Sequence, residues 1–172
     1  MLTIDDQFKL TAFEVALVGL NLELVTRVRR YKVSHYGCHA LFASGEVVQG
    51  PQIYLRKLHE SNRCAESLPF GLAQKAILVG KPDPIVTLVV HHANFDRHGH
   101  ILGAPTLAVP CGACLRILEQ VSPDCLIVID VDEQNGQGRL VKAPVEVCQQ
   151  YFAHARKHNG ESTEGEEDTS VA

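Results

Sequence analysis

Apolar side chains recur every three or four positions near the start of the chain, between about residues 5 and 29. The positions that carry this pattern are Phe13, Leu17, Leu20, Leu24 and Val28. On an α-helix of about 3.6 residues per turn, this spacing places them on a single stripe. The pattern therefore predicts a helix over about 5–29 that buries this stripe against the rest of the protein.

Shorter patterns predict β-strands in the middle of the chain. Two apolar segments flank the turn-forming sequence Ala43-Ser44-Gly45, which indicates a β-hairpin. Two other segments are continuous runs of aliphatic and β-branched residues, as is typical of strands covered on both faces. We expect the hairpin strands over 38–42 and 46–48, the covered strands over 85–90 and 126–129, and a short edge strand over 140–141.

Three further helices are expected over 64–79, 111–121 and about 144–158. Gly80 and Pro82 would end the first, Ser122 and Pro123 would end the second, and Pro144 suits the first turn of the third. Helices thus alternate with strands after the hairpin. This order predicts an α/β fold in which helices cover both faces of a mixed sheet of about five strands.

The composition indicates one folded domain followed by a short acidic tail. The chain has 172 residues, 45% of them hydrophobic, and no Pro/Gly/Ser-rich linker interrupts residues 1–158. Residues 159–172 contain five acidic side chains and neither lysine nor arginine. We therefore expect a single domain over 1–158 and a disordered acidic tail over 159–172.

Charge and hydropathy argue against two classes of partner. The net charge is −4, and the chain outside the tail is nearly neutral. It therefore lacks the excess of lysine and arginine with which proteins bind a phosphate backbone. No apolar run approaches the roughly 20 residues that cross a bilayer, and the sequence after Met1 lacks the pattern of a signal peptide. We expect a cytoplasmic protein that binds neither nucleic acid polymers nor membranes.

The six cysteines fall into two groups. Cys111 and Cys114 form a Cys-x-x-Cys pair at the start of a predicted helix, and Cys64 stands at the start of another. Such a pair typically supplies two ligands of a tetrahedral zinc site. With Cys64 as a third ligand and no evident fourth, the pattern predicts a catalytic zinc ion, which keeps one position for water. A structural zinc site and chance spacing are the alternatives.

Glu66 adds acid–base chemistry to this group. It lies two residues after Cys64, so its carboxylate can lie beside the open position, take a proton from water and pass it onward. The free N–H groups at two helix starts would offset the negative charge of the thiolates. The other three cysteines, Cys38, Cys125 and Cys148, are expected to be small buried residues.

The sequence Cys64-Ala65-Glu66, followed by Pro110-Cys111-Gly112-Ala113-Cys114, resembles the zinc signature of the cytidine deaminase superfamily. The three-cysteine form is similar to free-nucleoside cytidine deaminases and blasticidin-S deaminase, over about residues 38–131. The resemblance implies a cytidine-deaminase-like α-β-α fold, zinc bound by Cys64, Cys111 and Cys114, and Glu66 as the proton shuttle. It also implies that the backbones of Ala65 and Val109 hold the substrate's heterocycle.

Gln52 and Tyr54 are further candidate substrate contacts. They replace the Asn and Glu with which cytidine deaminases bind ribose, and Tyr54 offers one neutral hydroxyl instead of a charged double acceptor. This change argues against plain cytidine as the best substrate. Leu115 also stands where these enzymes usually have Arg. His35 and Tyr36 fall where relatives place an aromatic residue that stacks on the base.

The gap between Cys64 and Cys111 is wider than is usual in the family. The extra length falls over 91–103, which we expect to follow a strand and border the mouth of the site. Its histidines, which are His91, His92, His98 and His100, are interpreted as solvated loop or strand-end residues. A second metal site built from them is the alternative.

These features together predict hydrolytic deamination of a cytidine-like nucleoside or another amino-substituted nitrogen heterocycle, with release of ammonia. The expected partner is a small nucleoside or nucleobase analogue. The resemblance also implies a homo-oligomer, either a dimer or a tetramer. The alternatives are a catalytically inactive, zinc-stabilised scaffold or binding module, and editing of a base within RNA or DNA, which the lack of basic surface opposes.

Overall fold

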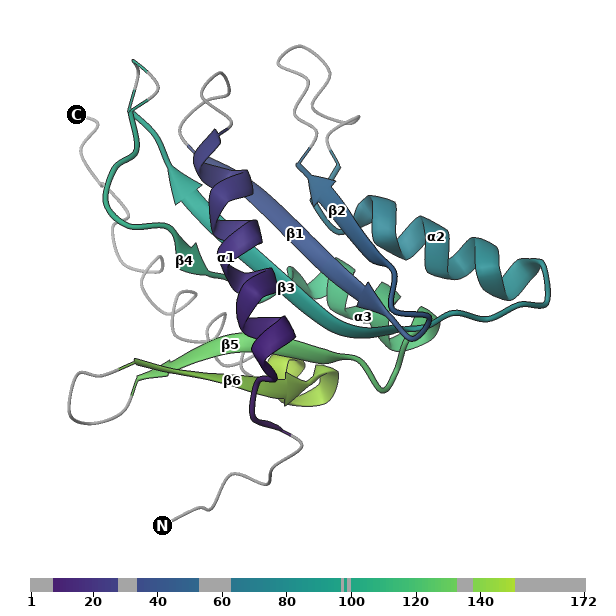
Figure 1. Cartoon of the computed structure of the whole chain (residues 1–172). Coiled ribbons are helices and arrows are strands. Elements are labelled where there is room, and N and C mark those ends of the chain that lie inside the picture. Colours follow the sequence, from purple (N-terminus) through teal and green to yellow (C-terminus); the bar gives the residue numbers. More distant parts are fainter. Residues whose placement is uncertain are drawn as a thin grey trace, which may run out of the picture.

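A mixed β-sheet between two helical layers organises the molecule (Figure 1). The computed structural model describes residues 8–27, 34–52, 63–96, 98, 100–132 and 138–150. The strands are β1 (Ser34–Phe42), β2 (Val47–Pro51), β3 (Ile85–Asn94), β4 (Thr106–Leu107), β5 (Leu126–Asp132) and β6 (Gly138–Pro144). The helices are α1 (Ala12–Arg27), α2 (Ser67–Leu78) and α3 (Gly112–Val121), and residues 145–150 are also helical.

The sheet has the order β2-β1-β3-β5-β6, and β4 pairs with β3 outside this path. The β3–β5 pair is parallel and the other pairs are antiparallel. Helix α1 lies across one face, while α2 and α3 lie on the other (Figure 1). The predicted three-layer α/β architecture with a mixed sheet is therefore confirmed, with six strands in place of about five.

The buried centre of the sheet matches the sequence pattern. Leu88, Val89 and Val90 of β3 and Ile127 and Val128 of β5 are almost completely buried, because helices cover both faces of these strands. The hairpin is also confirmed, with β1 antiparallel to β2. The cysteines outside the predicted metal group, Cys38, Cys125 and Cys148, are buried thiols as expected.

Helix α1 buries a different stripe from the one predicted. Leu17 is buried, but Phe13 and Leu20 are about half exposed, at 52% and 51%. The buried side includes Glu14 and Asn21 instead, because both find polar partners on the sheet. A pattern based on hydrophobicity alone could not identify two polar residues as the inward face. The helix begins at Ala12, several residues later than expected.

Two strands are longer than their apolar runs. Strand β3 continues through Asn94, so the segment 91–94 belongs to the sheet and not to a loop after it. Beyond the strand, Phe95 forms a bridge with Ile101, and β4 folds back onto His91 and His92. Strand β6 has seven residues in place of two. Cross-strand pairing and tertiary contacts outweigh the weak strand propensity of these polar residues.

Asn21 fastens α1 to the sheet through a buried polar network. Its side-chain N–H groups donate to the carbonyls of Gly37 and Val89, at 3.0 and 3.2 Å. The same amide group meets the ring nitrogens of His39 and His91, at 3.0 and 2.9 Å. Burial lowers the pKa of both histidines, with a further contribution at His91 from His39, so both rings are neutral near pH 7.

Glu14 makes a second buried connection between α1 and the sheet. Its carboxylate accepts a hydrogen bond from the Thr87 hydroxyl at 2.6 Å and pairs with Lys142 of β6 at 3.0 Å. Both charged side chains are nearly buried, at 5% and 10% exposure. Burial alone would raise the pKa of Glu14, but the hydrogen bonds from Thr87, Thr11 and Lys142 outweigh it and lower the pKa.

None of the helices in the described residues is both long and apolar enough to cross a bilayer. The predicted tail over 159–172, and the part of the last predicted helix after residue 150, lie outside the described residues.

Replacing Glu14 by Gln should destabilise the protein by about 3 kcal/mol, because Lys142 then remains as a buried charge without its partner. The matched control is Glu46→Gln at an exposed position of the hairpin turn, which should change stability by less than about 0.5 kcal/mol. Urea unfolding measures both values.

The pH dependence follows from the lowered pKa of Glu14. A carboxylate with a lowered native pKa stabilises the fold above its unfolded pKa, and this contribution is lost as the pH falls through the native value. The difference between wild type and Glu14→Gln should therefore shrink below about pH 4.5, the ordinary value. A difference that is small at pH 7, or constant with pH, would contradict this role.

Candidate active site

Two chain segments on one side of the sheet bring three cysteines together. Cys64 lies in the turn before α2, Cys111 is the N-terminal cap of α3, and Cys114 lies in the first turn of α3. The three Sγ atoms all lie within 4.8 Å of one another. Among the described residues, this is the one group of three or more potential metal ligands from Cys, His, Asp and Glu.

Local backbone geometry explains how both segments present their sulfurs. Helix α2 begins at Ser67, later than the sequence indicated, and Cys64 precedes it in a turn closed by the Ser67 N–H donating to the Cys64 carbonyl at 3.1 Å. Cys111 has an extended backbone, and its carbonyl accepts the first helical hydrogen bond from Leu115 at 2.9 Å. Both sulfur-bearing segments therefore end in a helix start, where N–H groups lack helical partners.

Burial and mutual charge repulsion oppose ionisation of the thiols in this group. Burial raises the pKa of Cys114, and nearby Glu66, Cys111 and Cys64 raise it further, because several negative charges in one small volume repel. Burial is also the main cause that raises the pKa of Cys64. Tetrahedral ligands held about 2.3 Å from a zinc ion lie about 3.8 Å apart. The observed spacing is thus close to what one metal ion requires.

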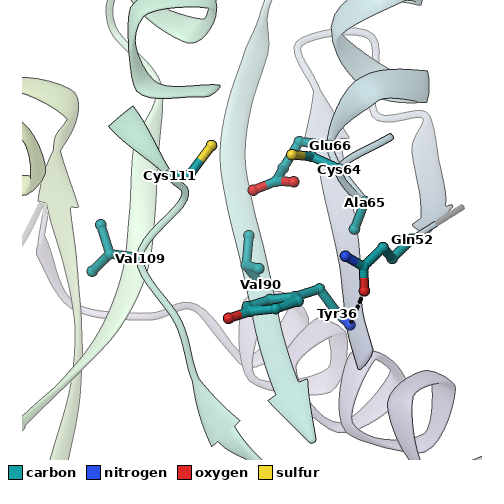
Figure 2. A pocket seen from close by; sticks show the side chains of 8 residues that line it. All are labelled: Tyr36, Gln52, Cys64, Ala65, Glu66, Val90, Val109 and Cys111. Carbon is teal, nitrogen blue, oxygen red and sulfur yellow. Dashed lines mark hydrogen bonds between the residues drawn. The ribbon is translucent and has the colours of Figure 1, made fainter. Parts of the chain in front are cut away.

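Glu66 lies beside this group and is almost completely buried, at 4% exposure. Burial raises its pKa, against the opposing effect of hydrogen bonds from its own backbone N–H and from Cys114. Its carboxylate and the sulfurs of Cys64 and Cys111 point toward the same space in Figure 2. A carboxyl group in this environment exchanges protons more readily near neutral pH than an exposed glutamate does.

A cavity of about 320 Å³ opens in front of the carboxylate, a volume at the lower end of the range for small-molecule sites. Its lining combines the metal-ligand candidates with apolar and neutral polar groups and, among the described residues, includes no basic side chain. The lining residues are Tyr36, Gln52, Cys64, Ala65, Glu66, Val90, Val109 and Cys111 (Figure 2).

The structure brings together most of the substrate contacts expected from the sequence. Gln52, Ala65 and Val109 all line the cavity. Gln52 is tied to β1, because its backbone N–H donates to the Tyr36 carbonyl at 3.0 Å and its side-chain oxygen accepts from the Tyr36 N–H at 3.3 Å. Tyr54 lies outside the described residues.

Of the two expected base-stacking residues, only Tyr36 lines the cavity. Side chains alternate between the faces of a strand, and His39 of β1 bonds Asn21 on the α1 side. His35 has the same parity as His39, so it lies on the α1 face, where it is buried at 3% exposure.

Gly50 is a supporting residue that the sequence analysis did not single out. A Cβ atom there would collide with the carbonyl oxygen of Ala65, so β2 approaches the turn that carries Cys64 and Glu66 more closely than any side chain allows. The same carbonyl accepts a hydrogen bond from the Cys38 thiol at 3.2 Å. Gly50 lay beyond the strand predicted over 46–48, so the sequence pattern carried no signal of this close approach, which becomes visible only because β2 extends to Pro51.

The histidines of the 91–103 segment do not share one site. His91 is buried at 4% exposure and bonded to Asn21 on the α1 side, so its interpretation as a solvated residue was wrong. His92 lies against Tyr36. His98 and His100 are exposed, and His100 pairs with Asp96 at 3.1 Å, an acidic companion that the spacing did not suggest.

Comparison with known proteins identifies the fold. No protein-family model and no curated protein matches the sequence. Among solved structures, cytidine deaminase from Bacillus anthracis has 14% identity and a TM-score of 0.56, covering 86% of this chain and 94% of its own. The chain has a cytidine deaminase fold. Cytidine deaminase from Burkholderia pseudomallei has 17% identity and a TM-score of 0.50, covering 81% and 96%. At such identities the likeness shows the fold alone.

Replacing Gly50 by Ala should destabilise the protein by about 1–3 kcal/mol, because the added methyl group must displace the backbone of the 64–66 turn. The matched control is Gly71→Ala in α2, where an added Cβ meets nothing within 4 Å. That change should be neutral or stabilising by up to about 1 kcal/mol. Urea unfolding of both variants tests this, and equal stabilities would show that the close approach is unimportant.

Proposed function

We propose that this protein is a zinc-dependent hydrolytic deaminase. It removes the exocyclic amine of a cytidine-like nucleoside, or of another amino-substituted nitrogen heterocycle, and releases ammonia. The observation that carries this proposal is the buried carboxylate of Glu66 beside three converging cysteine sulfurs, at the wall of a cavity. The cytidine deaminase fold supports it, and so does the resemblance of both cysteine motifs to the superfamily signature.

Cys64, Cys111 and Cys114 would hold the zinc ion. Their sulfur atoms are soft donors that suit zinc, and their spacing fits one ion. Three protein ligands are typical of catalytic zinc, whereas structural sites have four. When bound, zinc supplies Lewis acidity that makes water a stronger nucleophile at neutral pH. The positive charge would also offset the mutual repulsion among the thiolates and Glu66.

Glu66 performs the proton transfers of the proposed reaction. Its carboxylate accepts a proton from the attacking water and delivers it to the ring nitrogen of the heterocycle. The hydroxyl group that the water has added to the ring carbon then gives its proton to the same carboxylate, which delivers it to the amine. The C–N bond breaks, the carbonyl group forms and ammonia leaves. Burial raises the pKa of Glu66, and this favours a carboxyl group that alternates between both protonation states.

The cavity wall supports the choice of substrate. Val90, Val109 and Ala65 line the cavity and offer apolar contact to a flat ring. In this proposal the backbone N–H of Ala65 and the backbone of Val109 bond the edge of the ring, because the Ala65 carbonyl already accepts from the Cys38 thiol. Gln52 lies farther along the same wall and is a proposed substrate contact, as is Tyr54. The lining has no basic side chain among the described residues, which favours a neutral small molecule over a polyanionic strand.

A homo-oligomer, either a dimer or a tetramer, is part of the proposal. Phe13 and Leu20 of α1 lie two helical turns apart on the same side of the helix and are each about half exposed, so they present apolar area to their surroundings. Large exposed apolar patches often mark contact surfaces between proteins.

The metal ligands can be tested by zinc analysis of purified protein. Wild type should contain about one zinc ion per chain, and Cys64→Ser or Cys111→Ser should weaken zinc binding by more than about 100-fold, because each removes one of three ligands. Cys148→Ala is the control, since it removes a buried thiol outside the cluster. Equal zinc contents in all four proteins would contradict the assignment.

The role of Glu66 can be tested by ammonia release. Glu66→Gln should retain zinc but lose at least about 100-fold in kcat, because the amide cannot carry a proton between water and substrate. Glu119→Gln, at an exposed position of α3, should keep wild-type activity. Near-normal turnover by Glu66→Gln would refute the mechanism.

The same assay separates the proposed enzyme from an inactive zinc-stabilised scaffold or binding module. Suitable substrates are cytidine, deoxycytidine, cytosine, aminopurines and blasticidin-type nucleosides. Bound zinc without ammonia release from any of them would favour the scaffold.

A further inference from the structure

Tyr36 and His92 form an aromatic pair at the edge of the cavity. They are direct cross-strand neighbours in the β1–β3 register, and their ring centroids are 4.5 Å apart with an angle of 30° between the planes. His92 is also paired with Thr106 of β4 on its other side. His92 is thus paired with β4 through its backbone and contacts the ring of Tyr36 through its side chain.

The Tyr36 hydroxyl is a polar group without an assigned role. Tyr36 lines the cavity together with Cys64, Cys111 and Glu66. Its backbone is bonded to Gln52, but its hydroxyl makes no hydrogen bond within the described part of the chain. The hydroxyl is not one of the buried polar atoms that lack a partner in the described part of the chain, so it is open to solvent and can bond a ligand in the cavity. In Figure 2 the ring extends along the cavity, and the hydroxyl points away from Gln52.

The contact between Gln52 and β1 determines which hydrogen-bonding group of Gln52 is left for a ligand. Its side-chain oxygen accepts the Tyr36 N–H, so the amide nitrogen is the part of the group left to face the cavity (Figure 2). The amide nitrogen is a hydrogen-bond donor, and the Tyr36 hydroxyl can both donate and accept. The Gln52 amide and the Tyr36 hydroxyl are thus two separate neutral hydrogen-bonding groups of the lining, and in Figure 2 the apolar Val90 lies between Tyr36 and Glu66.

We propose that Tyr36 is a specificity-determining residue that binds a polar substituent on the heterocycle, and that His92 is its positioning residue. The inference rests on the proposed function, which places the reacting amine beside Glu66 and the cysteines. In Figure 2 these groups lie on the opposite side of the cavity from Tyr36. Tyr36 therefore meets the substituent far from the amine, such as the sugar of a nucleoside. Nucleosides should bind more tightly than free bases.

The test combines binding of the deamination products with kinetics. Isothermal titration with uridine and uracil measures affinity whether or not the protein is a deaminase. Tyr36→Phe keeps the ring and removes the hydroxyl, so it should weaken uridine binding about fivefold, the effect of one neutral hydrogen bond. Uracil binding should change less than twofold. For cytidine, KM should rise by the same factor while kcat stays within twofold.

Variants of His92 test the positioning role. His92→Ala should weaken uridine binding about as much as Tyr36→Phe, and His92→Phe should restore it because a flat ring again supports Tyr36. In the Tyr36→Phe background, His92→Ala should add less than a twofold loss, since both changes remove one interaction. His100→Ala, at an exposed position, is the control and should leave uridine affinity unchanged.

The outcomes separate this proposal from the proposed function. If Tyr36→Phe leaves uridine affinity unchanged, or weakens uridine and uracil equally, the specificity role is wrong even when ammonia release is normal. If wild type binds neither compound, it is also wrong. If uridine binding depends on Tyr36 as stated but no substrate yields ammonia, the binding role stands and the deaminase proposal fails.

Discussion

Electrostatic repulsion within one small volume is the constraint on which the rest of the site depends. Three cysteine sulfurs lie within 4.8 Å of one another, and Glu66 beside them is almost completely buried, with 4% exposure. As anions, these groups repel, and burial strengthens the repulsion. A divalent cation would turn this unfavourable arrangement into a stable one. Without a cation, protonation relieves the repulsion, in keeping with the raised pKa values of Cys64, Cys114 and Glu66. The proposed chemistry rests on a cation taking the place of the thiol protons, and the same burial raises the pKa of Glu66 toward the range useful for proton transfer.

The sheet supplies the rigidity that this arrangement needs. Cys64 and Cys111 are far apart in the sequence, and each lies just before a helix that packs on the same side of the sheet (Figure 1). Gly50 lets strand β2 approach the turn that carries Cys64 and Glu66. On the other face, Glu14 and Asn21 fasten α1 to the strands through buried polar contacts. The sheet that carries the candidate site on one face is therefore bonded to α1 on its other face.

The sequence predicted the parts of this structure that depend on local patterns. Continuous apolar runs marked β3 and β5, and the turn residues marked the hairpin. The Cys111 motif was placed correctly at a helix start, whereas α2 begins at Ser67, three residues after the predicted start at Cys64. It failed where polar residues are satisfied by distant partners. Asn21 and His91 are buried because they bond to each other across 70 positions. The stacking of His92 on Tyr36 depends in the same way on strand register, which no local pattern encodes.

X-ray absorption spectroscopy of the purified protein at the zinc edge tests the central claim most directly, because it reports the atoms bound to the metal. Three sulfur neighbours at about 2.3 Å and one oxygen neighbour at about 2.0 Å are expected. This pattern requires all three cysteines and leaves one position for water. Four sulfur or nitrogen neighbours would describe a closed structural site, and purified protein that binds no zinc would remove the basis of the proposed chemistry.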